Sequence, residues 1–266
     1  MVMASRRVHR RTFLIDLGHG ACALAVFGIA ACSPSASPSA SRSSPAPPPS
    51  PASSGPESPE SGVPSPSSAP TAVAWERVEL AIVSAYILAR NGEAAIVDTG
   101  VAGSEDEIEA SLAMIGLEWG AVGHVILTHL HPDHVGSATD VLGSAPDAKG
   151  YAGAPDISSI RVPRPLTEVA DGDEVFGLRI VATPGHTPGH ISVLDPVGGI
   201  FVAGDALNTV DGKVTGANPE FSQDMTTADA SVKAIAALEF ETLLVGHGDP
   251  ITKGASKLVA ELAAGL

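Results

Sequence analysis

The stretch His129-Leu130-His131-Pro132-Asp133-His134 places four side chains that can bind a metal ion within six residues. It follows Val125-Ile126-Leu127-Thr128, an apolar and β-branched run that predicts a buried strand. Side chains two residues apart on a strand point to the same face, so the first two histidines should project together from its end. Because the proline stops the strand, we expect Asp133 and His134 to follow on a turned loop. The spacing therefore predicts one ion at the first pair and a second, adjacent ion at the other pair.

Three further segments carry possible metal ligands, and each follows a predicted strand. His186 lies in Thr183-Pro184-Gly185-His186-Thr187-Pro188-Gly189-His190, where Pro-Gly turns should present it on a rigid loop. Val202-Ala203-Gly204-Asp205 and Val245-Gly246-His247-Gly248 are the other two. A single histidine in such a place is more often structural than a ligand. Three such segments in this order after the first motif indicate a metal centre.

The first 71 residues have the composition of an export signal and a tether. Arg10-Arg11 precedes an apolar stretch that is too short to span a bilayer, which resembles a twin-arginine signal in residues 1–32. Ile29-Ala30-Ala31-Cys32 resembles a bacterial lipobox, with an ordinary cleaved secretory signal as the alternative. Residues 33–71 are nearly all Ser, Pro and Ala, which predicts a disordered tether or a stalk with its own binding role. We therefore expect export, with membrane attachment only through a lipid at Cys32.

Residues 72–266 form the predicted folded domain, which is long enough for one sizeable core. The only two cysteines, Cys22 and Cys32, precede this domain, so it has no disulfide and no cysteine ligand. The formal net charge of the chain is −15, and nucleic acid is a poor partner for such an acidic protein.

The domain alternates predicted strands and helices. Ser104 and Glu107 have the spacing of a capping box, which predicts the start of a helix. We expect strands within 75–89 and at 94–97, 125–128, 174–182, 191–194, 199–203 and 243–245, and helices at 105–115, 135–142, 227–238 and 255–264.

Together these motifs resemble the metallo-β-lactamase superfamily, from Asp98-Thr99-Gly100 to Gly246-His247-Gly248. The resemblance implies an α/β fold, a four-layer αββα sandwich with metals held by loops at one edge of two sheets. It implies a first ion on His129, His131 and His186, and a second on Asp133, His134 and His247. It further implies that Asp205 bridges both ions, that Asp98 holds a metal loop, and that His190 supports the site. A simple turn-forming role is the alternative for Asp98.

Five imidazoles and two carboxylates suit two zinc ions and also tolerate iron or manganese. Two divalent ions can share a water, lower its pKa to about 7 and direct it at a carbonyl. Asp133 is then the candidate to carry the water proton to the leaving group. We therefore expect a dinuclear hydrolase of an ester, thioester, lactone or amide.

Departures from related subfamilies narrow the substrate. Asp205 stands where the best-known zinc β-lactamases use a cysteine, which argues against penicillin as the main substrate. Only 19 residues follow His247, too few for the helical domain with which glyoxalase II grips glutathione. Asn208 replaces the tyrosine of quorum-quenching lactonases. Its amide is a candidate to orient substrate or oxyanion, with a turn role in residues 208–212 as the alternative.

Two other classes of protein remain open. One is an oxidoreductase of the persulfide dioxygenase type, which uses a single iron. The other is a non-catalytic surface lipoprotein that keeps the fold as a binding module. The complete set of seven ligand candidates argues against the second class.

Overall fold

A computed structural model describes residues 71–266. The predicted export signal at 1–32 and the predicted tether as far as residue 70 lie outside the described residues. Between residues 71 and 266, no helix combines the length and the apolar character needed to cross a membrane.

The first sheet has six strands in sequence order. The order is β1 (Ala74–Leu80), β2 (Val83–Arg90), β3 (Glu93–Val97), β4 (Val122–Ile126), β5 (Lys149–Gly153) and β6 (Thr167–Val169). β1, β2 and β3 form an antiparallel meander, and β3 to β6 run parallel. The parallel half requires crossover connections, which contain the helices after β3, β4 and β5.

The second sheet has five strands that come from the C-terminal half. Their order is β13 (Thr242–Leu244), β10 (Ile200–Val202), β9 (Ile191–Asp195), β8 (Leu178–Ala182) and β7 (Glu174–Val175). Its pairs are antiparallel except for β10 and β13, which are parallel. A separate hairpin joins β11 (Leu207–Val210) to β12 (Lys213–Gly216).

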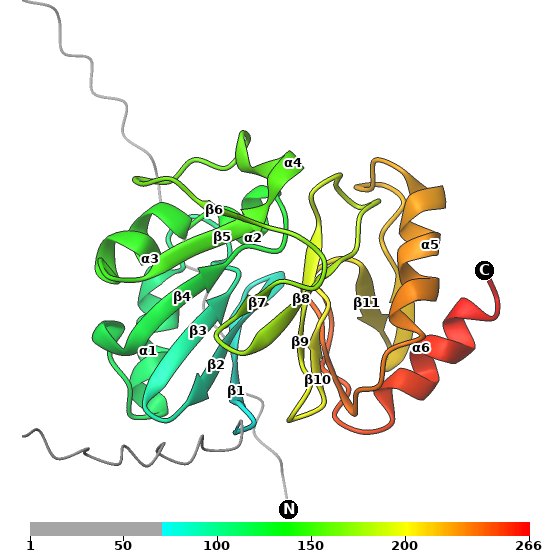
Figure 1. The fold of residues 1–266 in the computed structure, drawn as a ribbon, viewed down its shortest axis with the longest axis horizontal. Coiled ribbons are helices and arrows are strands. Elements are labelled where there is room, and N and C mark those ends of the chain that lie inside the picture. Colours follow the sequence, from blue (N-terminus) through cyan, green and yellow to red (C-terminus); the bar gives the residue numbers. More distant parts are fainter. Residues whose placement is uncertain (1–70) are drawn as a thin grey trace, which may run out of the picture. The chain divides into compact units, whose positions relative to one another are not determined.

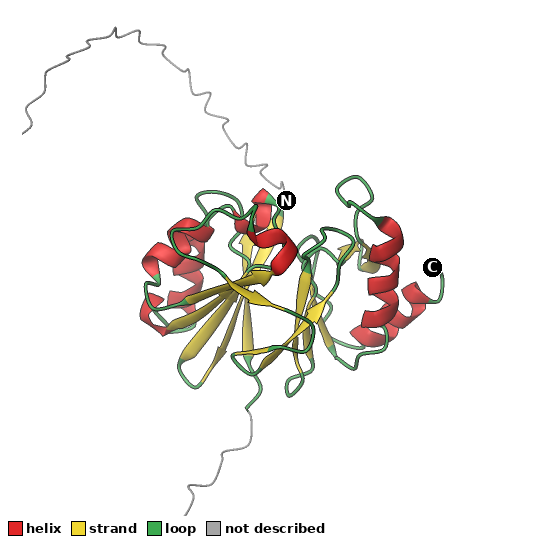
Figure 2. Ribbon diagram, turned by 45° about the horizontal axis from the view of Figure 1, so that its top comes forward, coloured by secondary structure: helices red, strands yellow, loops and turns green. Residues whose placement is uncertain are grey.

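Helices cover the outer faces of the two stacked sheets (Figure 1 and Figure 2). α1 (Glu105–Met114) and α3 (Ala138–Ser144) lie on the first sheet, and α5 (Met225–Ile235) and α6 (Ala255–Ala263) lie on the second. The short elements are a 3-10 helix (Trp119–Ala121), α2 (Pro132–Val135) and α4 (Ala154–Ile157). The expected α/β class and αββα layering are confirmed.

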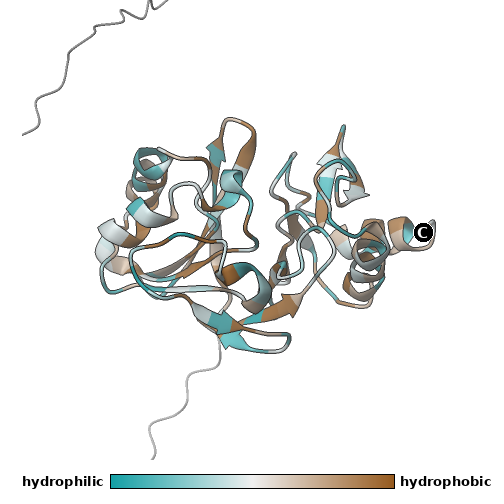
Figure 3. Ribbon diagram, turned by 90° about the horizontal axis from the view of Figure 1, so that it is seen from above, coloured by the Kyte–Doolittle hydropathy of each residue, from teal (hydrophilic) through white to brown (hydrophobic). Residues whose placement is uncertain are grey.

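Three apolar cores separate the four layers. Ile87 of β2 packs into the core shared with α1, whereas its neighbours Tyr86 and Leu88 face the second sheet. On β9, Val193 faces the first sheet and Leu194 packs into the core shared with α5 and α6. Strands buried on both faces need nearly continuous apolar sequence, and many strand residues are hydrophobic in Figure 3.

The predicted helix at 135–142 is two helices in the structure, and the predicted loop at Asp133 and His134 is the helix α2. Gly136 N–H donates to Gly100 O at 2.8 Å, and Ser137 Oγ donates to Val101 O at 2.7 Å. A Cβ on Gly136 would lie 2.4 Å from Ala102 N. These contacts with residues 100–102 hold the chain out of a continuous helix.

Ser104 takes the N-cap position of α1, but its side chain makes no capping hydrogen bond. Its backbone N–H donates instead to Ser137 Oγ at 2.8 Å. The capping-box prediction is therefore wrong, although the helix itself is correct. A tertiary contact replaces the local one.

The predicted strand at 174–182 is the hairpin of β7 and β8. Phe176 and Gly177 form its turn with positive φ angles of 54° and 64°, a conformation that joins antiparallel strands tightly. The strand prediction at 125–128 is correct only as far as Ile126. β5, β6, β11 and β12 were not predicted, because they are short and have no regular apolar pattern.

Candidate metal centre

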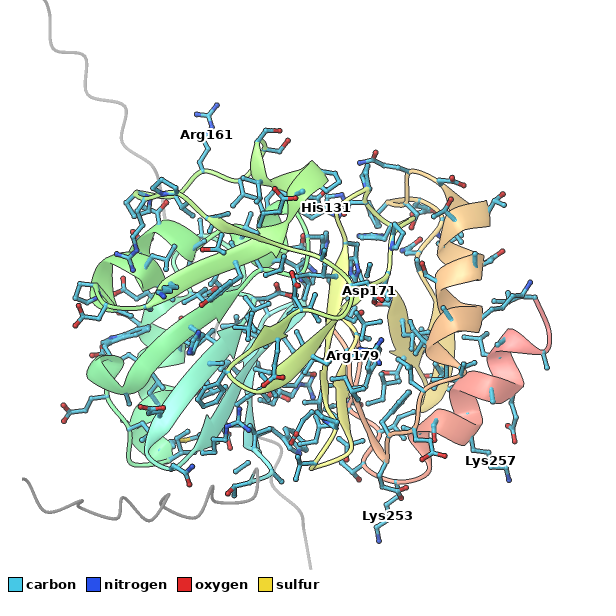
Figure 4. All side chains as sticks on the ribbon, viewed as in Figure 1. His131, Arg161, Asp171, Arg179, Lys253 and Lys257 are labelled. Carbon is cyan, nitrogen blue, oxygen red and sulfur yellow. The ribbon has the colours of Figure 1, made fainter. Side chains whose placement is uncertain are left out.

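The candidate ligands lie at strand ends that meet at one edge of the sandwich. β8 and β10 both pair antiparallel with β9, so they run in the same direction, and β13 runs parallel to β10. The loops after these three strands therefore carry His186, Asp205 and His247 to the same edge. The loop after β4 brings the first motif there, and His131 marks this edge in Figure 4.

Three imidazoles converge at the first candidate ion position. His129 Nε2 lies 3.1 Å from His131 Nδ1, and His186 Nε2 lies 2.9 Å from the same atom. His129 and His186 are buried, and His131 is half-buried. These three residues form one group whose ligand atoms are close enough to share an ion.

Asp133, His134 and His247 form a second such group. His247 Nε2 lies 3.2 Å from Asp133 Oδ2, and His134 Nε2 lies 3.8 Å from the same oxygen. The second group lies next to the first, because the ligand atoms of His129 from the first group and His134 from the second are close to each other and to Asp205. The fold thus brings together all seven predicted ligands.

Asp205 contacts both groups with its two carboxylate oxygens. Oδ1 lies 3.2 Å from His134 Nε2, and Oδ2 lies 3.4 Å from His186 Nε2 and 3.3 Å from His247 Nε2. A Cβ on Gly246 would lie 2.4 Å from this Oδ1, so a larger residue there would displace the carboxylate. The geometry matches a carboxylate that faces two ion positions at once.

The outward-facing N–H groups of four imidazoles each have an acceptor. His129 Nδ1 lies 3.0 Å from Thr128 Oγ1, and His134 Nδ1 lies 2.8 Å from Asp98 Oδ2. His186 Nδ1 lies 3.0 Å from Ser222 Oγ, whose own hydrogen donates to Asn218 O. His247 Nδ1 donates to Ile82 O at 2.7 Å. Such contacts occupy Nδ1, so Nε2 is the nitrogen that holds the lone pair for a metal whenever the ring is neutral.

Asp98 links the two groups of candidate ligands through hydrogen bonds on the side away from the candidate ion positions. Its Oδ2 accepts from the Thr128 hydroxyl at 2.8 Å and from His134 Nδ1 at 2.8 Å, and its Oδ1 accepts from Thr128 N–H at 2.7 Å. Because the Thr128 hydroxyl in turn accepts from His129, one carboxylate orients an imidazole of each group. Asp98 also has a φ of +63°, which aspartate tolerates better than most residues.

His190 is buried and uses both ring nitrogens inside the protein. Its Nε2 accepts from Asp205 N–H at 3.0 Å, and its Nδ1 lies 2.8 Å from Thr183 Oγ1. Burial lowers the pKa of His190 to about 3, which keeps the ring neutral. His190 therefore positions the Asp205 backbone and has no free nitrogen for a metal.

The electrostatics differ between the two groups. Burial lowers the pKa of His129 well below its usual value and that of His186 to about 4. Burial opposes charge on His134 too, but the Asp98 and Asp205 carboxylates overcome it and raise its pKa well above the usual value. Asp133 and Asp205 raise the pKa of His247 to about 10. At neutral pH the first group is thus ready to bind a cation, whereas the second must first release protons.

The donor set fits divalent metal ions. His134 Nε2 and Asp205 Oδ1 are both buried, and neither makes a hydrogen bond of acceptable geometry. Buried polar atoms normally have partners, and these two atoms, which lie 3.2 Å apart, are placed where both could bind one cation. Imidazole nitrogens and carboxylate oxygens are ligands for zinc, iron and manganese.

Asp156 is a buried residue of the site that the sequence analysis did not identify. Its Oδ2 accepts from Leu130 N–H at 3.1 Å and from the Thr187 hydroxyl at 2.6 Å. Its Oδ1 accepts from Gly189 N–H at 2.8 Å. One carboxylate on α4 therefore joins the loop of the first motif to the loop of His186. No local pattern around Asp156 signals this role.

Asp156→Asn should weaken binding of the first metal ion about tenfold. The carboxylate accepts three hydrogen bonds, and the NH2 group of asparagine would face one of these three donors and could not accept from it. A titration of the metal-free variant with zinc and a competing chromophoric chelator measures this change. Asp140→Asn, on the exposed face of α3, is the matched control and should bind as the wild type does. Equal affinities for Asp156→Asn and the wild type would contradict the prediction.

Asn208 lies on β11 and not in a turn. Asp211 and Gly212 form the hairpin turn, with φ angles of 50° and 74°. Asn208 Nδ2 donates to Gly216 O at 3.3 Å, and its Oδ1 is buried without a partner. The alternative of a turn role for Asn208 is therefore wrong, and the residue lines a cavity that opens beside Asp205.

Comparison with known proteins identifies a family. The sequence profile described as "Metallo-beta-lactamase superfamily" matches residues 78–158 and 144–247. A "Probable metallo-hydrolase YflN" of Bacillus subtilis is 32% identical over 48% of this chain and 65% of that protein. A "Hydroxyacylglutathione hydrolase" of Acidiphilium cryptum is 35% identical over 61% of this chain and 63% of that protein. The chain thus spans less than two thirds of the length of these two relatives.

Solved structures share the fold. A metallo-beta-lactamase family protein from Thermus thermophilus superposes with a TM-score of 0.58 at 24% identity, covering 72% of this chain and 78% of that one. The protein TTHA1623, solved in a di-iron-bound form, gives a TM-score of 0.56 at 25% identity. The match covers 69% of this chain and 95% of the TTHA1623 chain.

Proposed function

The chain belongs to the metallo-beta-lactamase superfamily, and from that premise we propose that it is a hydrolase that depends on two divalent metal ions. The proposed reaction is cleavage of an ester, thioester, lactone or amide bond in a small molecule. Zinc is the proposed metal, and iron or manganese would fit the same donors.

One observation carries this proposal: the donors of His129, His134, His186 and His247 face inward while their outer N–H groups are bound. Such an arrangement aims the Nε2 atom of each neutral ring at a cation, and the rings of His134 and His247 release a proton when the cation binds. We propose His129, His131 and His186 for the first ion and Asp133, His134 and His247 for the second, with Asp205 on both.

The reaction needs a proton acceptor beside the metals. When bound, divalent ions at this site would polarise a substrate carbonyl and lower the pKa of water. The Asp133 side chain is 26% exposed and lines the cavity. The His247 imidazole beside Asp133 lowers the pKa of its carboxyl group, which keeps it ionised. We propose that this carboxylate takes a proton from the attacking water and passes it to the leaving group.

A metal analysis joined to a substrate screen tests the proposed function. The purified protein should carry two divalent ions and hydrolyse at least one of an ester, thioester, lactone and β-lactam series. Removal of the ions by a chelator should abolish turnover, and zinc should restore it. A single iron with oxygen uptake would favour the persulfide dioxygenase type, and a metal-free inactive protein would favour a binding module.

Asn208→Ala should lower kcat/KM about tenfold without loss of metal, because the amide lines the cavity beside Asp205 and holds Gly216. Metal content and kinetics on the best substrate measure the two effects separately. Thr226→Ala, at an exposed position of α5, is the control and should match the wild type. Unchanged kinetics for Asn208→Ala would leave the residue with a structural role alone.

The sequence also supports a proposal about location, which concerns residues outside the described range. We propose that the protein is exported and attached to the bacterial cell membrane through a lipid on Cys32. Cys32→Ala should release the protein into the medium or leave it unprocessed, as cell fractionation would measure. Normal processing with unchanged membrane retention would contradict the lipid anchor.

A further inference from the structure

A large cavity opens beside the metal centre. Its volume is about 1020 Å³, which is large enough for a molecule well beyond the size of a single acyl group. Its charged and titratable lining consists of four candidate metal ligands: His131, Asp133, Asp205 and His247. The rest of the lining comes from residues that carry no charge.

The mouth of the cavity is apolar. Ile82, Val210 and Phe221 line it and are 69%, 57% and 63% exposed. They are three of the seven large apolar side chains that are exposed within residues 71–266. They come from three separate segments: the turn after β1, the end of β11 and the connection from β12 to α5. Exposed apolar side chains gathered around one opening mark a binding surface.

No lysine or arginine in the described part of the chain lines the cavity. Arg77 reaches the rim, where it donates to Gly248 O at 2.9 Å, but its guanidinium is also paired with Glu79 and Asp249. Arg161 points away from the domain, and Lys253 and Lys257 lie at the end opposite His131 (Figure 4). A carboxylate in the outer part of the cavity would therefore lose water without a lysine or arginine among the lining residues to pair with it.

We propose that the cavity selects uncharged esters or lactones with an apolar group, and disfavours substrates that carry a carboxylate away from the reacting carbonyl. The inference rests on the proposed function and specifies its substrate class. In the reaction, water oxygen bonds to the carbonyl carbon and the bond from that carbon to the leaving oxygen breaks. The proton released by the water reaches the leaving oxygen, with Asp133 as the carrier.

Matched substrates test this selection. Phenyl butyrate and monophenyl succinate share a leaving group and differ in a methyl or a carboxylate at the acyl end. Methyl 4-acetoxybenzoate and 4-acetoxybenzoic acid share the acetyl group and differ in a methyl ester or a carboxylate on the leaving group. We expect the zinc-loaded protein to favour the uncharged member of at least one pair by tenfold or more in kcat/KM. S-lactoylglutathione, which carries carboxylates far from its thioester, should be a poor substrate.

Phe221→Lys places a cation at the mouth and should reduce the preference ratio at least threefold. Val197→Lys is the matched control, because Val197 is also exposed, at 45%, but lies outside the cavity. That variant should keep the wild-type ratio. Equal use of both members of both pairs, or an unchanged ratio in Phe221→Lys, would overturn the inference.

Dye binding separates the cavity from the chemistry. Nile red, which is uncharged, should bind the zinc-loaded protein with increased fluorescence, and Phe221→Ala should weaken this binding at least threefold. Met114→Ala removes another exposed apolar side chain, one that lies outside the cavity, and should leave dye binding unchanged. If the metal-loaded protein binds the dye in this way but hydrolyses nothing, the proposed function fails and the cavity assignment stands. If Phe221→Ala binds the dye as the wild type does, the cavity assignment fails whatever the activity.

Discussion

Asp205→Ala should leave about one bound metal ion per protein in place of two, and reduce kcat/KM by about 100-fold or more, the scale of losing a major electrostatic stabiliser. The reason is the position of its carboxylate, which lies within 3.4 Å of His134, His186 and His247. The first group keeps three imidazoles, which suffice to hold one zinc ion. The second group loses a charged donor and should empty first. Elemental analysis of the purified variant gives the ratio.

Two further variants sharpen this test. His247→Ala should resemble Asp205→Ala in metal content, whereas His129→Ala should damage the stronger, first site. Asp195→Ala is the control for loss of a buried carboxylate, because Asp195 accepts from the backbone of Val73 and Val197 and touches no candidate ligand. It should keep two ions. If the wild type carries a single iron and Asp205→Ala loses it, the dinuclear hydrolase proposal fails and the iron oxidoreductase takes its place.

Asp98→Asn should lower metal affinity at both positions by about 10- to 100-fold, the usual effect of removing a partner behind a metal ligand. Asparagine keeps the shape and tolerates the positive φ of this residue. However, the amide nitrogen must face Thr128 or His134 as a donor, where the carboxylate accepts from both. The imidazoles of His129 and His134 then lose their fixed orientation.

Competition with a chromophoric chelator measures the affinities of Asp98→Asn, and circular dichroism checks that the fold persists. Asp211→Asn is a useful control, since Asp211 also has a positive φ but lies in the exposed turn of the β11–β12 hairpin. It should bind metal normally. Wild-type affinity in Asp98→Asn would mean that Asp98 only shapes the turn after β3.

The sequence by itself determined the candidate ligands and the class of fold. Four of the six residues from His129 to His134 are candidate ligands, and they are so close in the chain that local geometry alone predicts that they share a site. The Pro-Gly loop at His186 and the strand ends before Asp205 and His247 were also predicted, because each depends on residues that are close together in the chain. Apolar strands buried on both faces also leave a clear local pattern, which is why β2, β9 and β10 were predicted.

Only the tertiary structure decided which partners hold these ligands and which surface faces the substrate. Asp156 meets Leu130 and Gly189 across 26 and 33 residues, and Asp98 meets Thr128 across 30. A buried carboxylate needs partners, but packing and not local sequence selects which backbone or side-chain donors come within reach. The same holds for the apolar mouth at Ile82, Val210 and Phe221, where three distant segments become one surface only after the sheets have stacked.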